Sequence, residues 1–217
     1  PEKHILINNS QPLDCLDIKY KNILGSINIS EDVILALRKK LKEKGINQFI
    51  IFHPSAQYNY KIYPKHLRNV LLKNLTKLGV SILITGSNNK IDLKIKKEIP
   101  TSLNIFNFIG KTSLEEYFAL SYLSEAYIGM DTLNMHIAAS QNKRIFAIFG
   151  STKLSTWSPW SNHSQFSAKK DAPIQTYDNI TIFQSSISCK ICGKVGCGMS
   201  HGIEEFPYII DPDIIFN

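Results

Sequence analysis

Short apolar segments alternate with helical patterns between residues 45 and 150, and this alternation restricts the fold more than any other feature of the chain. Helices are indicated where apolar residues recur every three or four positions, and strands where short apolar runs end in glycine or small polar residues. Strands are expected at 49–52, 80–85, 105–109, 127–129 and 144–149, and helices at 30–44, 64–78, 88–98 and 134–139 and from 113 onward. Alternation with short connections predicts an α/β fold, in which a parallel sheet carries helices on both faces.

The two ends of the chain interrupt this pattern. Residues 1–28 read as an irregular or partly helical lead-in, because Pro12 and Gly25 break the periodicity. Residues 29–217 are expected to form one domain, whose tail at 151–217 is predicted to be loop-rich with a short terminal helix. No apolar run reaches the length of a membrane span, and the first residues do not resemble a secretory signal.

The formal net charge of +7 comes mainly from scattered lysines. Solvated helix faces are the simpler interpretation of such a pattern. A functional role for the charge would favour an anionic partner, either a phosphorylated substrate or an acidic membrane surface. Nucleic acid is not expected as a partner, because arginine is rare and no stripe of interleaved basic and aromatic residues is present.

The segment from Tyr127 to Ala139 carries the clearest chemical signal. A buried strand ends next to Asp131, and a helix begins within a few residues. Unpaired amides and the positive end of the dipole make a helix start an anion site. Asp131 would repel a bare phosphate, so it fits better as an acceptor for hydroxyls of a sugar joined to that phosphate, with His136 orienting the loop or donating to phosphate. The alternative is structural: Asp131 or Thr132 caps the helix, and His136 is a buried core residue.

Further candidates lie where other strands end. Lys61 lies in the connection after the first strand, and lysine suits a diphosphate as a flexible point charge. A solvated role remains the simpler interpretation for one lysine among many. Gly86, Ser87 and Gly110 are small residues that let a ligand approach the backbone, although glycine also ends many strands for turn reasons. Neither a dinucleotide fingerprint nor a P-loop is present.

Taken in order, these pieces resemble the C-terminal domain of glycosyltransferase family nine, the heptosyltransferases of lipopolysaccharide core synthesis. The resemblance covers roughly residues 30–215 and rests on six segments: His53-Pro54-Ser55-Ala56, Lys61-x-Tyr63-Pro64, Ile84-Thr85-Gly86-Ser87, Ile109-Gly110-Lys111-Thr112-Ser113-Leu114, Gly129-Met130-Asp131-Thr132-x-x-Met135-His136, and Phe149-Gly150-Ser151-Thr152. A later segment with Cys189, Cys192 and Cys197 resembles the heptosyltransferase III-like branch.

The resemblance implies a Rossmann-like domain that forms the donor-binding half of a GT-B enzyme. Inverting heptosyl transfer from ADP-heptose to the lipopolysaccharide core would need neither a metal nor a cofactor. The enzyme would act in the cytoplasm, with peripheral contact at the inner face of the membrane. The implied donor-binding residues include residues 132–134, whose backbone amides would hold phosphate; the full set is Ser55, Lys61, Gly86, Ser87, Gly110, Asp131, Thr132, Leu133, Asn134 and His136.

The same resemblance places the acceptor site and the general base in an N-terminal domain, on a separate or missing segment. We therefore expect donor binding from this chain, but no catalytic residue. Two departures from the family pattern affect the donor. Leu133 replaces the usual glycine, and is expected to narrow the phosphate loop or to force a different turn. Residues 88–90 lack the acid that often meets the ribose, which weakens the expectation of adenosine.

Two other functions remain open at the level of sequence. The first is a non-catalytic or differently specific nucleotide-sugar-binding domain, since one scaffold serves many donors. The second is a zinc-knuckle module, because the spacing C-x2-C-x4-C-x3-H of Cys189, Cys192, Cys197 and His201 suits a zinc site. Reduced thiols or one local disulfide are the simpler interpretations of these cysteines.

Overall fold

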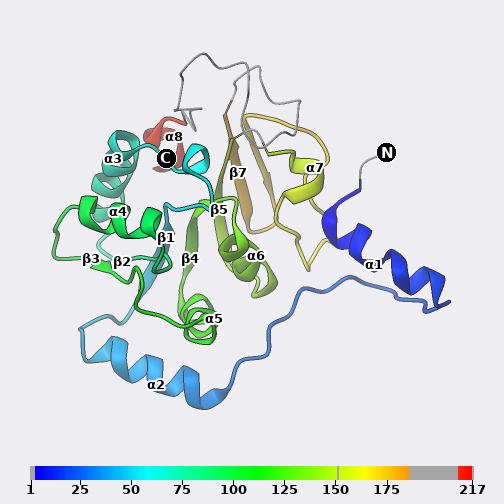
Figure 1. Ribbon diagram of the computed structural model, residues 1–217, viewed down its shortest axis with the longest axis horizontal. Helices are drawn as coiled ribbons and strands as arrows, with labels where there is room; N and C mark the ends of the chain where they lie inside the picture. Colours follow the sequence, from blue (N-terminus) through cyan, green and yellow to red (C-terminus); the bar gives the residue numbers. More distant parts are fainter. Residues whose placement is uncertain (1–2, 151, 186–209, 217) are drawn as a thin grey trace.

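A twisted, mostly parallel sheet forms the centre of the computed structural model, which describes residues 3–150, 152–185 and 210–216. Its seven strands lie in the order β3-β2-β1-β4-β5-β7-β6, and only β6 and β7 pair antiparallel (Figure 1). The strands are β1 (Phe49–His53), β2 (Ser81–Ile84), β3 (Ile105–Asn107), β4 (Ala126–Met130), β5 (Arg144–Phe149), β6 (Ile174–Tyr177) and β7 (Ile180–Gln184). The predicted parallel sheet is therefore confirmed.

Helices cover both faces of the sheet, as predicted. Alternate residues of each strand point to opposite faces, so the strands contribute to two separate hydrophobic cores. The first core is closed by α2 (Glu31–Lys42), α5 (Leu114–Leu123) and α6 (Leu133–Ser140). The second is closed by α3 (Lys65–Thr76), α4 (Lys90–Glu98) and α8 (Pro212–Phe216).

Local sequence signals set several helix starts. Ser113 begins α5 with a complete capping box, in which its hydroxyl accepts from the Glu116 amide and the Glu116 carboxylate accepts from the Ser113 amide. Asn89 caps α4 by accepting from the Asp92 amide at 2.8 Å. Pro64 was expected within the first turn of its helix, but its extended ψ of 139° makes it the N-cap, so α3 begins one residue later.

The tail contains more regular structure than the sequence predicted. Besides the short helices α7 (Leu154–Trp157) and α8, it supplies β6 and β7, joined by a two-residue turn. Asp178 occupies that turn with a φ of 47°, which aspartate tolerates better than most residues. β7 pairs with β5 in parallel and extends the sheet, whereas β6 lies at its edge with no fully buried residue.

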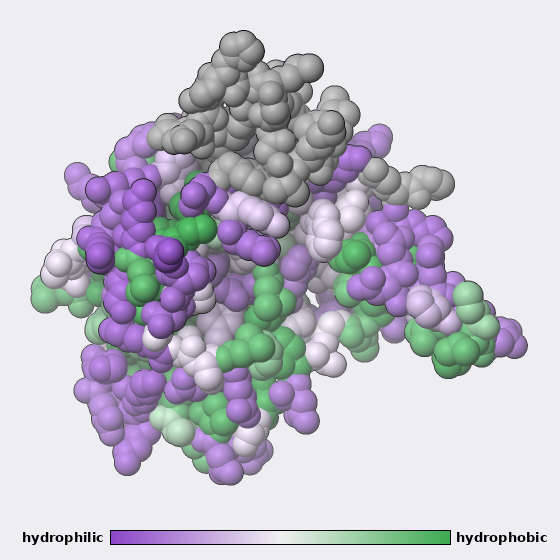
Figure 2. All heavy atoms as spheres, viewed as in Figure 1, coloured by the Kyte–Doolittle hydropathy of each residue, from purple (hydrophilic) through white to green (hydrophobic). Residues whose placement is uncertain are grey.

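The lead-in, residues 1–28, contains the helix α1 (Ile5–Cys15) followed by an extended segment (Figure 1). Its anchor is the buried His4, whose Nε2 lies 2.8 Å from the carbonyl oxygen of Ser158. Figure 2 shows hydrophobic residues at the far end of α1, where Leu16 is 68% exposed. Within the described residues, no helix combines the length and apolarity needed to cross a membrane.

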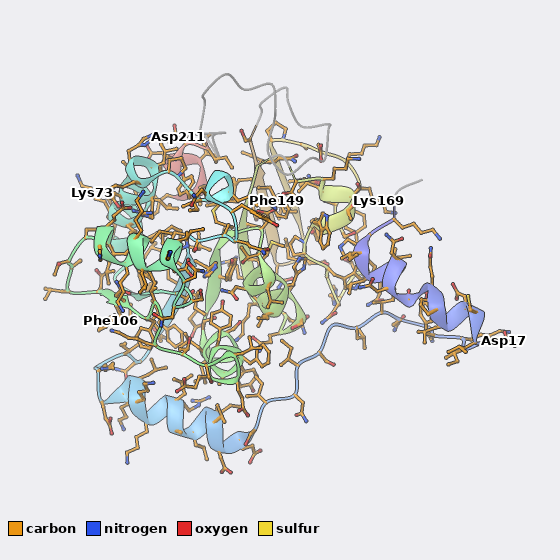
Figure 3. The ribbon with its side chains drawn as sticks, viewed as in Figure 1. Asp17, Lys73, Phe106, Phe149, Lys169 and Asp211 are labelled. Carbon is orange, nitrogen blue, oxygen red and sulfur yellow. The ribbon has the colours of Figure 1, made fainter. Side chains whose placement is uncertain are left out.

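The last described residues, 210–216, pack against α3 and contribute Ile210 and Ile215 to the second core. The Tyr63 hydroxyl donates to the carbonyl oxygen of Ile210 at 2.6 Å, and the Asn74 amide donates to Asp213 Oδ1 at 2.6 Å. Figure 3 labels Asp211 beside α8 and Lys73 on the neighbouring α3. The predicted short terminal helix is thus present, and it packs on α3.

Candidate functional site

The strand order reverses between β1 and β4, and this reversal places the candidate site. The chain moves outward from β1 to β3 and then returns to β4 on the other side of β1. Connections from two neighbouring parallel strands then leave in opposite directions, which opens a crevice at their carboxyl ends. Gly129 of β4 lies opposite His53 of β1, and a Cβ atom there would come within 2.4 Å of the His53 carbonyl oxygen. Only glycine permits this close approach.

Lys61 and Asp131 meet at this reversal. Lys61 ends the short 3-10 helix η1 (Asn59–Lys61) after β1, and Asp131 directly follows β4. Lys61 Nζ donates to Asp131 Oδ2 at 3.0 Å and to Thr152 Oγ1 at 2.9 Å. The Asp131 side chain is 3% exposed and that of Lys61 is 21% exposed, so the carboxylate is buried and the lysine side chain is partly accessible. The predicted site residues Lys61 and Asp131 therefore form an ion pair.

A second contact at the reversal joins α6 to His53 at the end of β1. The side-chain amide of Asn134, on α6, lies 2.9 Å from His53 Nδ1, which also lies 3.0 Å from the Thr85 hydroxyl. Burial lowers the pKa of His53 to about 4, although nearby Asp92 acts in the opposite direction. The ring is therefore neutral at pH 7, and its unprotonated nitrogen can accept a hydrogen bond from the NH2 group of Asn134.

The buried carboxylate of Asp92 joins the ends of β1 and β2. It accepts from the Ser55 hydroxyl, from the Ser87 amide and from the Asn89 side-chain amide. Asp92 is 3% exposed, although it lies in a helix that is otherwise largely charged and solvated. Three donors compensate for the burial of its charge. The predicted site residues Ser55 and Ser87 are thus brought together by a residue that the sequence analysis did not select.

The two predicted glycines, Gly86 and Gly110, contact each other, and Gly86 lies against Asp92. The amide of Gly110 donates to the carbonyl oxygen of Gly86 at 2.9 Å. A Cβ atom on Gly86 would come within 3.2 Å of the Asp92 carboxyl group. Gly110 has a φ of +69°, a conformation that residues with side chains rarely adopt. Close packing against Asp92 therefore favours glycine at position 86, and the positive φ favours glycine at position 110.

Leu133 is the first residue of α6, its φ is not positive, and its side chain is 64% exposed. That it narrows the phosphate loop or forces a different turn stays a prediction. Thr132 is the N-cap by position, yet its side chain makes no capping bond, so the structural alternative of a Thr132 cap is not supported. Burial and the neighbouring His4 lower the pKa of His136 to about 4.

The predicted residues thus fall into two neighbouring groups. The first group lies at the reversal and contains Lys61, Asp131 and the predicted residues at the start of α6. The second, called the Asp92 group below, lies near Asp92 and contains Ser55, Gly86, Ser87 and Gly110. Sequence reasoning missed Asp92 and Thr152. The sequence signal for Asp92 is the pattern Asn-x-x-Asp, which starts a helix soon after a strand ends. Thr152 belongs to the segment Phe149-Gly150-Ser151-Thr152 that carries the family resemblance, but no role was predicted for it.

The proposed zinc ligands Cys189, Cys192, Cys197 and His201 lie outside the described residues. Among the residues that are described, no three His, Cys, Asp or Glu side chains are grouped in a way that could hold a metal ion.

Comparisons with known proteins agree with the fold. The chain is 28% identical over 131 residues to lipopolysaccharide heptosyltransferase 3 of Escherichia coli, an alignment that covers 58% of this chain and 38% of that protein. A glycosyl transferase family 9 structure from Veillonella parvula DSM 2008 superposes with a TM-score of 0.77 at 16% identity, covering 99% of this chain and 58% of the other. Escherichia coli heptosyltransferase WaaC with ADP superposes with a TM-score of 0.63 at 11% identity, covering 99% and 56%.

The chain therefore spans between 38% and 58% of the length of these three relatives. The family model described as glycosyltransferase family 9 (heptosyltransferase) matches residues 5–184, which include the reversal, the Lys61–Asp131 pair and the Asp92 group. With most of its length matched by that model, this chain belongs to glycosyltransferase family 9, the heptosyltransferases.

Proposed function

We propose that this chain is the donor-binding half of an inverting GT-B heptosyltransferase, which transfers heptose from ADP-heptose to a sugar hydroxyl of the lipopolysaccharide core. The observation that carries this proposal is the ion pair of Lys61 and Asp131 at the strand reversal, directly before the start of α6. The names of the curated relative and of the solved relative, which contains ADP, support the choice of donor.

The donor diphosphate would bind between Lys61 and the first turn of α6. A lysine ammonium group has three N–H donors, and Lys61 uses two of them on Asp131 and Thr152, with no partner for the third among the described residues. The amides in the first turn of α6 have no side-chain cap from Thr132. A phosphate oxygen could therefore accept from both, and the helix dipole would favour its charge.

Asp131 would serve the sugar rather than the phosphate. A carboxylate beside a diphosphate is repulsive unless a cation lies between them, and Lys61 supplies that cation at 3.0 Å. Carboxylate oxygens have several acceptor positions, so Asp131 can accept from Lys61 and from hydroxyl groups of a sugar. The Lys61 ammonium group would thus offset the repulsion between the Asp131 carboxylate and the diphosphate.

The nucleoside would lie along the Asp92 group. Ser87 and Gly110 are exposed beside the half-buried Gly86, so the nucleoside would contact the surface that these three residues form. Asp92 already accepts from Ser55, Ser87 and Asn89, so its role would be to hold these connections rather than to bind ribose. Because residues 88–90 carry no acid for the ribose, a donor with a different nucleotide is the second candidate.

The remaining parts of the proposal concern the whole enzyme. An inverting transfer requires a base next to the acceptor hydroxyl, which we expect from an N-terminal domain together with the acceptor site. We assign no catalytic residue in this chain, and neither metal nor cofactor. We place the reaction in the cytoplasm, with peripheral contact at the inner face of the membrane that would be aided by the net charge of +7.

Calorimetric titration of the chain with ADP-heptose, ADP and UDP-glucose tests the proposal. We expect ADP-heptose to bind best. Lys61→Ala should weaken both ADP-heptose and ADP, and Asp131→Ala should weaken ADP-heptose. Lys65→Ala is the matched control, because it removes an exposed lysine four positions later. Preference for UDP-glucose would favour the second candidate, and unchanged titrations for both site variants would refute the site.

A further inference from the structure

Lys61 is held at the strand reversal by a contact that its proposed role does not require. Its ammonium group lies 2.9 Å from the hydroxyl of Thr152, a residue 91 positions later in the chain and beyond the end of β5. Exposed lysine side chains adopt many rotamers, and they lose this freedom when they bind a ligand. A second fixed contact, in addition to the Asp131 carboxylate, reduces that loss before any ligand arrives.

Thr152 is in turn fixed from the interior of the sheet. Gln184, the last residue of β7, is 3% exposed, and its side-chain amide donates to the carbonyl oxygen of Thr152 at 3.3 Å. The same amide nitrogen lies 3.5 Å from the carbonyl oxygen of Gly150. Figure 3 labels Phe149 at the end of β5, where this connection leaves the sheet. The chain of contacts therefore runs from β7, through the segment after β5, to the ammonium group of Lys61.

We propose that Thr152 is a positioning residue for donor binding, which acts through Lys61 by holding its ammonium group where the diphosphate enters. This inference rests on the proposed function, because it assumes a diphosphate at Lys61. Gln184 supports the role by fixing the backbone of Thr152. The hydroxyl oxygen accepts from Lys61, so a side chain of the same shape without a hydroxyl loses the contact and leaves the charge in place.

Thr152→Val and Thr152→Ser separate this role from a structural one. We expect valine to weaken ADP binding roughly tenfold, since the Lys61 side chain is then less restrained before binding and loses more rotamer freedom on binding, and serine to remain within about twofold of the wild type. Adenosine binding should change by less than about twofold in both variants, because adenosine carries no phosphate for Lys61. Thr156→Val is the matched control on α7.

A double-mutant cycle then tests whether Thr152 acts through Lys61. In a Lys61→Ala background, Thr152→Val should change ADP affinity by less than about twofold, measured by NMR titration up to millimolar ADP so that weak binding is still detected. An equal effect in both backgrounds, an equal effect on ADP and adenosine, or no effect in the wild type would each overturn the inference. Absence of ADP binding by the wild-type chain would instead refute the donor site itself.

Discussion

Gly129→Ala is the substitution whose effect follows most directly from the fold. A Cβ atom at this position would lie 2.4 Å from the His53 carbonyl oxygen, 2.9 Å from the Tyr127 hydroxyl and 3.0 Å from His53 Cβ. The nearest of these atoms belongs to the backbone of β1, which cannot rotate away as a side chain can. Overpacking of this kind lowers the free energy of unfolding by about 1–3 kcal/mol, and we expect a clash with backbone in the middle of a sheet to lie at the upper end of this range.

Thermal unfolding followed by circular dichroism measures this cost. For a chain of this size, 1 kcal/mol corresponds to about 2–4 °C, so a loss of about 3 kcal/mol lowers the Tm by about 6–12 °C. Gly79→Ala is the comparison, because its Cβ meets nothing within 4 Å and only its φ of +70° is unfavourable. We expect this control to cost about 1–2 kcal/mol.

ADP titration at a temperature where both variants are folded completes the test. Gly129→Ala displaces β1 from β4 and so separates His53 from the α6 side of the reversal, whereas Gly79→Ala lies at the other end of the sheet. We therefore expect weaker ADP binding only in Gly129→Ala. A Tm for Gly129→Ala within about 1 °C of the wild type would show that the strands do not approach as closely as the structure has them.

Two further predictions concern buried ionisable groups. His53 and His136 both have folded-state pKa values of about 4, against 6.5 for the unfolded chain, so the unfolded chain binds more protons between these values. Stability should therefore be fully present above pH 6.5 and fall as the pH is lowered toward 4, by on the order of 3 kcal/mol at most for each ring, and His136→Gln should flatten this slope in urea unfolding between pH 7.5 and 5. Asp92→Ala leaves the buried Ser55 hydroxyl and the Ser87 amide without their acceptor, so we expect a loss of about 2–4 kcal/mol in the free energy of unfolding. A loss below about 0.5 kcal/mol would mean that Asp92 is not the link between β1 and β2.

The sequence predicts β1 to β5 and their helices well because each carries its own signal. Apolar runs bounded by glycine define the strands, and caps such as Ser113 define helix starts. The hairpin of β6 and β7 also carries a local signal, which the sequence analysis did not use. Residues 174–177 and 180–183 are rich in the strand formers Ile, Thr, Tyr and Phe, and the two turn residues Asp178 and Asn179 separate them. The parallel pairing of β7 with β5 is the part that depends on tertiary structure.

The same distinction separates the predicted from the missed parts of the site. Asp131 follows directly after β4, and Lys61 lies in the connection after β1, so the sheet topology brings both to the carboxyl ends of neighbouring strands. Asp92 looks like one more charge on a solvated helix, and only the fold shows that it turns inward to Ser55, 37 positions earlier. Thr152 depends on β7 for its place, so it could not be assigned a role while β7 itself was not predicted.

The packing of α8 on α3 has a consequence for how the chain matures on the ribosome. The residues of β1, α3 and β2 are synthesised before the segment 210–216, which supplies the acceptors for the Tyr63 hydroxyl and the Asn74 side-chain amide. At about 5–20 residues per second, that segment follows α3 by on the order of ten seconds. During this interval the apolar surface that Ile210 and Ile215 will later cover is open to solvent, so nascent chains that end before residue 210 present it to chaperones and to one another.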